Sequence, residues 1–406
     1  MPAAWREQGD IVTHRRSSGW ARAVSVVAAL VAATLPPRAV AWWLADEARP
    51  AFRGEAHAER AIALGEARWG SVTPADFGTG SALFDREWAF GTPMMRAACL
   101  AQVILRHPDL EAELAPHLGV AAADLAAPGA RAFTVRQWRS DPLEADVPGH
   151  DHAAFLGYGG FALGLTRAAA TSPAAEDNYS VMMSRLRSRL RVARGRWLET
   201  YPGEVYPVDV ASAVGAAAID ARLRGRDPLS DPDIAAALER VRGATDPATG
   251  LLYQAIDPET GEPRDGPRGS GTLLAAYFIL PADPDLSRAW FEAGRRELAD
   301  SVLGFGVMRE RPRSAPGHGD IDSGPIVFGY GVSATGFAIA PARAFGDEGV
   351  YTTATATAAL FGAPTAGPGG ERSHVTGGPL GDAILCAMGT SPTPAEVAVW
   401  LDRVRS

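Results

Sequence analysis

Residues 207–223 read "PVDVASAVGAAAIDARL", a segment rich in small residues and apolar on nearly every face of a helix. A helix that is apolar on all sides has to be buried on all sides. The segment that follows, from residue 230, reads "SDPDIAAAL"; it starts with polar residues and is amphipathic. We therefore predict a pair of helices, the first buried and the second facing water.

The same pairing recurs six times along the chain. The buried members are expected at 84–106, 152–170, 207–223, 270–280, 325–344 and 379–389, and their amphipathic partners begin near 107, 175, 230, 282, 346 and 391. A helical hairpin repeated every roughly 55 to 65 residues predicts an all-α (α/α)6 toroid, in which the inner helices surround a central cavity. The alternative is a linear α-solenoid. Its ends would need polar capping repeats, whereas the last pair here is as apolar as the others.

One stretch interrupts the helical pattern. Residues 246–269 carry two Asp-Pro-x-Thr-Gly turns around the short apolar run "LLYQAI". Such turns on either side of a strand-like run predict a β-hairpin, either an ordinary connection or a flap over one end of the toroid. The predicted organisation is an N-terminal segment at 1–41 and a single (α/α)6 domain at 50–406.

Composition excludes several functions. The chain of 406 residues is 47% hydrophobic and 21% charged, with a net charge of -8, so a globular core is expected and a nucleic-acid surface is not. Nucleotide-binding and zinc-binding motifs are absent from the sequence, so we predict no cofactor and no metal. The two cysteines, Cys99 and Cys386, lie far apart within apolar stretches. One bridge is possible in an exported protein, but the pattern favours two buried thiols.

The N-terminus has the order of an export signal. Arg15, Arg16 and Arg22 precede the uncharged run "AVSVVAALVAATL" at 23–35, and an Ala-x-Ala pattern ends at Ala41. We expect an exported protein, periplasmic or extracellular. The segment is either cleaved after Ala41 or kept as a membrane anchor, and no oligomeric state is predicted.

Polar residues stand just before or at the start of each inner helix. In an (α/α)6 ring these positions meet on one face, so residues far apart in sequence are expected to share a site. The predicted catalytic residues are Asp320, Asp322, Glu204, Asp209 and His152. The predicted substrate-binding residues are Asp85, Trp88, Tyr158, Tyr206, Arg268, Tyr330 and Asp382.

Each candidate also has a structural interpretation. Asp322, Asp209 and Asp382 are placed where a carboxylate caps a helix or meets its dipole. The aromatic residues are candidates for the core, and His152 for a buried histidine. A cap, however, needs only one acid. If residues 319–323 are extended, Asp320 and Asp322 point to the same side, and one pKa should rise to create a proton donor beside an acceptor. Such a pair, or one such acid facing Glu204 or Asp209, suits acid–base chemistry at a C–O bond.

Two segments resemble the linalool dehydratase/isomerase-like family of (α/α)6 proteins, which is related in architecture to toroid glycosidases and sugar epimerases. They are "DPLEADVPGHDHAAFLGYGGFALGL" at 141–165 and "YPGEVYPVDVASA" at 201–213. The resemblance implies the fold and functional roles for His152 and Glu204. The family's terpene-acting members carry a cysteine before the glutamate, where this chain has Gly203, so linalool is not implied as the substrate.

Two functions of different classes follow. The first is an exported, cofactor-independent acid–base enzyme, a lyase, isomerase or hydrolase, acting on an isoprenoid-like hydroxylated small molecule or on a glycan. The second is a non-catalytic envelope protein that binds a lipid or glycan or scaffolds partners. Among enzymes, an apolar cavity would favour an isoprenoid, and a polar cleft would favour a glycan.

Overall fold

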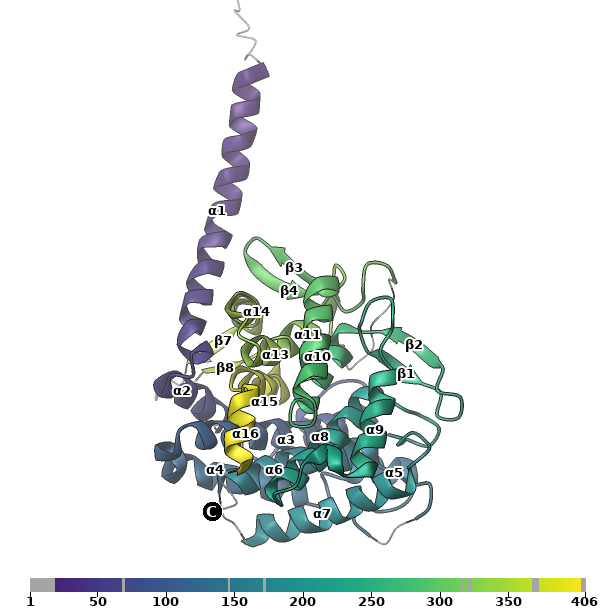
Figure 1. Cartoon of the computed structure of the whole chain (residues 1–406). Helices are drawn as coiled ribbons and strands as arrows, with labels where there is room; N and C mark the ends of the chain where they lie inside the picture. The colour runs from purple at the N-terminus through teal and green to yellow at the C-terminus, as the bar shows by residue number, and fades with distance from the viewer. Residues whose placement is uncertain are drawn as a thin grey trace, which may run out of the picture.

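The structure is a computed structural model that describes residues 19–67, 70–144, 147–170, 173–315, 317, 319, 323–366 and 372–402. Six inner helices form a closed ring, because each contacts the next and the last contacts the first (Figure 1). They are α3 (Ala82–Arg106), α6 (Ala153–Ala169), α8 (Pro207–Leu223), α10 (Gly269–Ile279), α12 (Val332–Phe337) and α15 (Gly378–Gly389). The (α/α)6 toroid is thereby confirmed, and an open solenoid is excluded.

Each inner helix is followed by a second helix. These are α4 (Glu111–Ala126), α7 (Pro173–Val192), α9 (Pro232–Gly243), α11 (Pro284–Leu298), α14 (Glu348–Gly362) and α16 (Pro394–Asp402). Short 3-10 turns, η2 (Pro108–Leu110) and η3 (Pro228–Ser230), lead into α4 and α9. The last helix differs from the prediction: α16 contacts α8 and lines a cavity with residues of α3, α6, α8 and α10, so it lies across one end of the ring.

Small residues allow the inner helices to approach one another closely. A Cβ on Gly215 of α8 would collide with the backbone carbonyl of Phe278 in α10, and a Cβ on Gly157 of α6 would collide with Ser212 in α8. Since real side chains do not tolerate such contacts, glycine is required where these helices cross. The small residues of α8 that were noted in the sequence therefore form its contact surface with α6 and α10.

The fifth inner helix is shorter than predicted. Residues 326–331 form a hairpin of β5 (Ile326–Val327) and β6 (Tyr330–Gly331) in place of helix, because Phe328 and Gly329 have positive φ angles of 53° and 86° that suit a tight turn. The helix then breaks between α12 and α13 (Ile339–Ala344). Pro341 has no N–H to donate to the carbonyl one turn earlier, which accounts for the break.

The two faces of the ring differ in their connections. Links from an inner helix to its partner are short, whereas links into the inner helices are long and carry α5 (Ala132–Trp138) and four hairpins. The hairpins are β1 (Tyr253–Ile256) with β2 (Pro263–Pro267), β3 (Ala299–Val302) with β4 (Phe305–Met308), β5 with β6, and β7 (Pro364–Ala366) with β8 (Arg372–His374). The predicted 246–269 hairpin is confirmed; the other three were not predicted. We call the face with long connections the mouth.

The ring axis is filled by aromatic side chains. Tyr158 and Phe161 of α6 pack against Phe278 of α10 with ring centroids 4.9 and 4.8 Å apart, and Tyr277 packs on Phe161 at 5.4 Å. The cavity beside α16 is about the size of one water molecule. The central cavity expected from the sequence is therefore closed at this level.

Two helices precede the ring. α1 (Gly19–Phe52) projects beyond the barrel, and its C-terminal part packs on α14, while α2 (Ala56–Ala67) packs on α3 and α15 (Figure 1). The predicted boundary at residue 41 falls inside α1. Ala41 is buried against Phe305 and Ala356. Among the described helices, none combines the length and the apolar character needed to cross a membrane.

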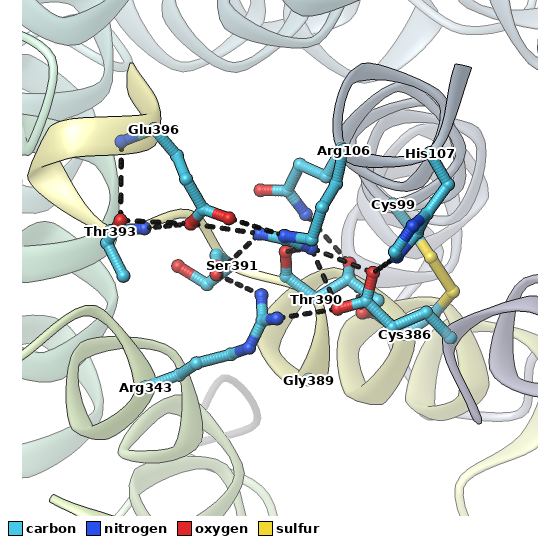
Figure 2. Close-up of polar contacts among 12 residues, drawn as sticks. Cys99, Arg106, His107, Arg343, Cys386, Gly389, Thr390, Ser391, Thr393 and Glu396 are labelled. Carbon is cyan, nitrogen blue, oxygen red and sulfur yellow. Dashed lines mark hydrogen bonds and ion pairs between the residues drawn. A yellow bond between two sulfur atoms is a disulfide. The ribbon is translucent and has the colours of Figure 1, made fainter. Parts of the chain in front are cut away.

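The seam between the first and last inner helices is held by buried bonds (Figure 2). Cys99 of α3 and Cys386 of α15 form a disulfide with Cα atoms 5.5 Å apart, so the expectation of two free thiols was wrong. Although 287 positions separate them in sequence, ring closure makes their helices neighbours. Beside them, Glu59 of α2 is fully buried and accepts hydrogen bonds from Arg106 at 2.7 and 2.9 Å and from Arg343 at 2.6 Å.

Candidate functional site

Asp209 is a predicted catalytic residue whose carboxylate is buried at the mouth. It stands in the first turn of α8, is 7% exposed, and accepts hydrogen bonds from the hydroxyls of Tyr158 at 2.6 Å and Thr200 at 2.5 Å. The residue at the N-cap of α8 is Tyr206, and the partners of the Asp209 carboxylate are hydroxyls of neighbouring segments. Asp209 therefore joins α6, α8 and the turn before α8.

The acidity of Asp209 is abnormal. Burial raises its pKa to about 6, although the hydrogen bonds from Thr200 and Tyr158 oppose the rise. Neutral hydroxyls stabilise an ionised carboxylate less than a cation does, so desolvation prevails. A carboxyl group with this pKa is partly protonated near neutral pH and can donate a proton.

A second carboxylate, Glu87, was not among the predicted site residues. It is half-buried on α3 and accepts a hydrogen bond from the hydroxyl of Tyr201, the neighbour of Thr200 in the chain. Adjacent residues of one turn thus hold Glu87 and Asp209. The sequence signal was weak but present, because Glu87 lies between Asp85 and Trp88, both of which had been selected at this helix start.

Glu204 and Tyr206 belong to the same turn, nearer to solvent. Glu204 is exposed and accepts a hydrogen bond from the Tyr206 hydroxyl at 2.9 Å. The backbone of this turn is fixed by the Thr200 N–H, which donates to the Glu204 carbonyl at 2.9 Å. Glu204 and Tyr206 therefore contact each other, Tyr158 contacts Asp209, and the turn that holds Thr200 and Glu204 links the two pairs.

His152 lies in a separate cluster. It is fully buried in a left-handed conformation with φ 53°, its Nδ1 is 2.7 Å from Thr134 Oγ1, and its Nε2 is 3.2 Å from Ser140 Oγ. Burial lowers its pKa to about 3, and the charges of Arg189 and His150 act in the same direction. A neutral, enclosed imidazole fits the structural interpretation. The cluster still supports the mouth, since Trp138, which packs on His152, donates to the Thr200 carbonyl at 2.9 Å.

The remaining predicted residues have local partners. Asp85 accepts from Thr79 at 2.8 Å, Arg268 donates to Asp265 at 2.9 Å, Tyr330 donates to Asp300 at 2.9 Å, and Asp382 binds the His374 ring at 2.8 Å; Trp88 packs edge-on against Phe77 at 6.0 Å. These contacts tie mouth loops to their own helices. The structure does not bring these five residues into contact with Asp209 within the part of the chain it describes.

Asp320 and Asp322 lie outside the described residues, so their roles stay predictions.

Two further groups at the mouth were missed. Glu310 is 1% exposed and accepts a hydrogen bond from Ser270, in the first turn of α10, at 2.5 Å. Phe328, at the tip of the β5–β6 hairpin, is 92% exposed despite its strained left-handed backbone. Neither had a sequence signal, because their positions depend on turns that the helical pattern concealed. Phe328 offers an apolar ring beside the mouth.

The mouth can support proton transfer without a bound metal. Nowhere in the described residues do three His, Cys, Asp or Glu side chains gather as a metal site requires. What the geometry provides is a weakly acidic carboxyl in Asp209, a half-exposed tyrosine in contact with it, and a second carboxylate in Glu87. These are the components of general acid–base catalysis.

Comparisons with known proteins identify no family for this chain. No family model matches the chain, and no curated protein matches it. Among solved structures, it is similar to the GH76 α-mannanase of Bacteroides thetaiotaomicron (TM-score 0.47, 10% identity, covering 78% of this chain and 87% of that one). It is also similar to an inactive variant of the GH76A α-1,6-mannanase of Salegentibacter sp. HEL1_6 in complex with α-1,6-mannotetrose (TM-score 0.47, 13% identity, covering 86% of this chain and 99% of that one). A third similar structure is the unsaturated glucuronyl hydrolase of Streptococcus agalactiae (TM-score 0.48, 13% identity, covering 85% of this chain and 91% of that one). Likenesses this distant assign neither activity nor substrate to this chain.

Proposed function

We propose that this protein is an exported hydrolase that cleaves glycosidic bonds at the mouth of its toroid. The observation that carries the proposal is the buried Asp209 carboxyl, held by hydroxyls alone and linked through one turn to the second carboxylate, Glu87. An isoprenoid would need an apolar cavity of its own size, whereas the axis is packed with aromatic rings and the cavity beside α16 is water-sized. A polar mouth suits a hydroxylated polymer better.

The proposed reaction uses one donor and one acceptor. Protonated Asp209 passes its proton to the oxygen of Tyr158, whose own hydroxyl proton moves to the leaving glycosidic oxygen. Glu87 takes a proton from the water that attacks the anomeric carbon as the C–O bond breaks. The sum is hydrolysis, with one water consumed and the two carboxyl groups exchanging protonation states.

The test is hydrolysis by the purified chain of a panel of soluble glycans, among them α-1,6-mannan and unsaturated uronides, measured as new reducing ends. Asp209→Asn and Glu87→Gln should each lower turnover by about 10²–10⁴-fold, the usual contribution of a general acid or base. The matched control is Asp231→Asn, at the N-cap of α9 on the opposite face, which still caps its helix and should keep full turnover. Glycan binding with no reducing ends from the native chain would overturn hydrolysis and favour the non-catalytic alternative.

We further propose that the protein is exported and keeps α1. A disulfide between inner helices suits an oxidising compartment, and the basic and apolar N-terminus has the order of an export signal. Retention is supported by the packing of α1 on α14 across Ala41, the proposed cleavage site. N-terminal sequencing of envelope fractions tests this. A mature chain beginning at residue 42 would refute retention, and a reduced cytoplasmic chain would refute export.

A further inference from the structure

Three separate segments on the mouth side expose apolar side chains within about two turns of α1. Trp42 and Trp43 of α1 are 65% and 54% exposed; Val302 and Leu303 at the β3–β4 tip are 43% and 40% exposed; Leu360 and Phe361 at the end of α14 are 44% and 64% exposed. We call these six residues the apolar rim. Isolated exposed apolar residues are ordinary on proteins, but a gathering from three elements marks a contact surface.

Their proximity along α1 follows from packing. A Cβ on Gly304 would touch the Cβ of Ala41 at 3.2 Å and the Cα of Arg38 at 3.8 Å, so the hairpin tip rests on α1 one turn before the tryptophans. α14 runs antiparallel to α1: Glu348 at its start pairs with Arg49 at 2.9 Å, and Ala356 packs with Ala41. The end of α14 therefore lies beside the part of α1 that precedes Ala41.

The tip of the β3–β4 hairpin has an unfavourable backbone conformation for the leucine that it contains. Leu303 has φ 53° and Gly304 has φ 93°, a two-residue turn in which asparagine or glycine is ordinarily preferred at the first position. A leucine in a left-handed conformation that stays 40% exposed offsets only part of this cost by packing. Strain of this kind persists where the side chain serves a contact outside the folded chain.

The apolar part of α1 identifies the partner. Val24, Val26, Val27, Val31 and Leu35 are all 46–59% exposed on the section that projects beyond the ring, on the same side as the β3–β4 hairpin (Figure 1). At 3.6 residues per turn, Val26 points roughly opposite to Val24 and Leu35, so one protein neighbour would cover only part of this surface. Lipid surrounds a helix on every side. The uncharged run 23–35 rises about 20 Å, less than the hydrocarbon core of about 30 Å, and tryptophans concentrate at the lipid–water interface.

We infer that the apolar rim is a lipid-contact surface, with α1 entering the acyl region and Trp42, Trp43 and Leu303 at the interface. Because β3–β4 lies among the connections into the inner helices, this contact holds the mouth toward the bilayer. A glycan presented at the membrane would then meet the site directly. This last consequence rests on the proposed hydrolase function, whereas lipid contact does not.

The experiment places a fluorophore on the rim of the full chain. Since the two native cysteines are joined, Leu303→Cys introduces a single free thiol for an NBD label. The matched control is Leu229→Cys, an exposed leucine (48%) on η3 at the opposite face. On adding phosphatidylethanolamine–phosphatidylglycerol vesicles, NBD emission at position 303 should rise about twofold or more and be quenched by shallow doxyl lipids, with no change at position 229.

A binding measurement complements the label. Leu303→Asp should weaken co-sedimentation with the same vesicles about tenfold, and Leu229→Asp should leave it unchanged. The inference is overturned if the chain does not sediment with vesicles, or if it does so while position 303 stays solvent-like. It is equally overturned if the signal at position 303 rises with protein concentration in the absence of lipid, which would indicate a second copy of the chain. Each of these results leaves the hydrolysis assay on soluble glycans unaffected, so failure of one proposal is distinguishable from failure of the other.

Discussion

Two buried carboxyl groups, Glu59 at the seam and Asp209 at the mouth, have opposite electrostatic environments. Burial alone would raise the pKa of Glu59, but the hydrogen bond from His107 and the charges of Arg343 and Arg106 together lower it. Asp209 is held by the hydroxyls of Tyr158 and Thr200, and burial raises its pKa to about 6. The difference teaches that the partner, and not the depth, separates a structural carboxylate from a proton donor in this fold.

The two regions also differ in how they are built. The seam uses a disulfide and ion pairs between helices, so its groups are fixed from several directions. The mouth uses long connections, and the turn at residues 199–206 contacts both of its carboxyls, with Tyr158 of α6 as a second partner of Asp209. We therefore expect substitutions at the seam to act on stability, and substitutions at the mouth to act on protonation and turnover.

The largest effect on stability is expected at the seam. Glu59→Gln leaves Arg106 and Arg343 buried without their shared anion, which should lower the free energy of unfolding by about 3–5 kcal/mol in urea titrations. The control is Glu113→Gln, which breaks an exposed ion pair with Arg60 of the same helix α2 and should change nothing measurable. Equal effects of the two substitutions would contradict the structural role of Glu59.

The disulfide should rank next. Replacing both Cys99 and Cys386 by alanine opens a loop of 287 positions in the unfolded chain and should lower stability by about 2–5 kcal/mol. Reductant should lower the melting temperature of the native protein and leave the double variant unaffected. Since neither cysteine lies at the mouth, glycan turnover at 25 °C should survive; its loss in a folded double variant would place the bond in the site.

The pH dependence of stability should distinguish the two carboxyls. Because the folded pKa of Asp209 lies above the ordinary 3.8, its ionisation opposes folding. This penalty, about 2–3 kcal/mol, is complete above pH 6 and disappears as the pH falls toward 4. Asp209→Asn should therefore be more stable than the native protein at pH 7.5, with the gain reduced to about 1 kcal/mol at pH 4.5 and lost below the ordinary pKa of 3.8. The ionised carboxylate of Glu59 has the opposite effect, because it stabilises the fold. This stabilisation is present above the ordinary pKa of 4.5 and is lost at lower pH.

The smallest effect on stability is expected from Tyr158→Phe. The substitution removes one hydroxyl donor to Asp209, so the pKa of that carboxyl should rise further, while stability changes by only about 1 kcal/mol. Because the Tyr158 hydroxyl carries the proton to the leaving group in the proposed reaction, turnover should fall by about 10²–10⁴-fold. Tyr179→Phe is the control, because Tyr179 donates to Asp220, which also pairs with Arg187 and Arg224. Unchanged turnover in Tyr158→Phe would remove Tyr158 from the proton path.

Periodicity in the sequence determined the ring. Segments that are apolar on every face have to lie inside, and their amphipathic successors have to cover them, so six pairs were predictable at nearly the observed positions. The same local pattern indicated which turns meet at the mouth, and Glu204, Tyr206 and Asp209 were selected for that reason. The sequence did not predict the hairpins at 299–308, 326–331 and 364–374, because short strands within long connections leave no periodic pattern of apolar residues.

Only the tertiary structure decided the roles of individual groups. The sequence pattern favoured two separate buried thiols at residues 99 and 386, and ring closure made their helices neighbours. Nothing in the sequence indicated a structural role for Glu59, because its partners come from distant helices. Likewise, His152 and Asp209 looked equivalent at helix starts. One is enclosed as a neutral imidazole, whereas the other is a carboxyl with hydroxyl partners at the mouth. The physical reason is that periodicity reports which face of a segment is buried, whereas acidity and cross-linking depend on which groups from other segments arrive at that face.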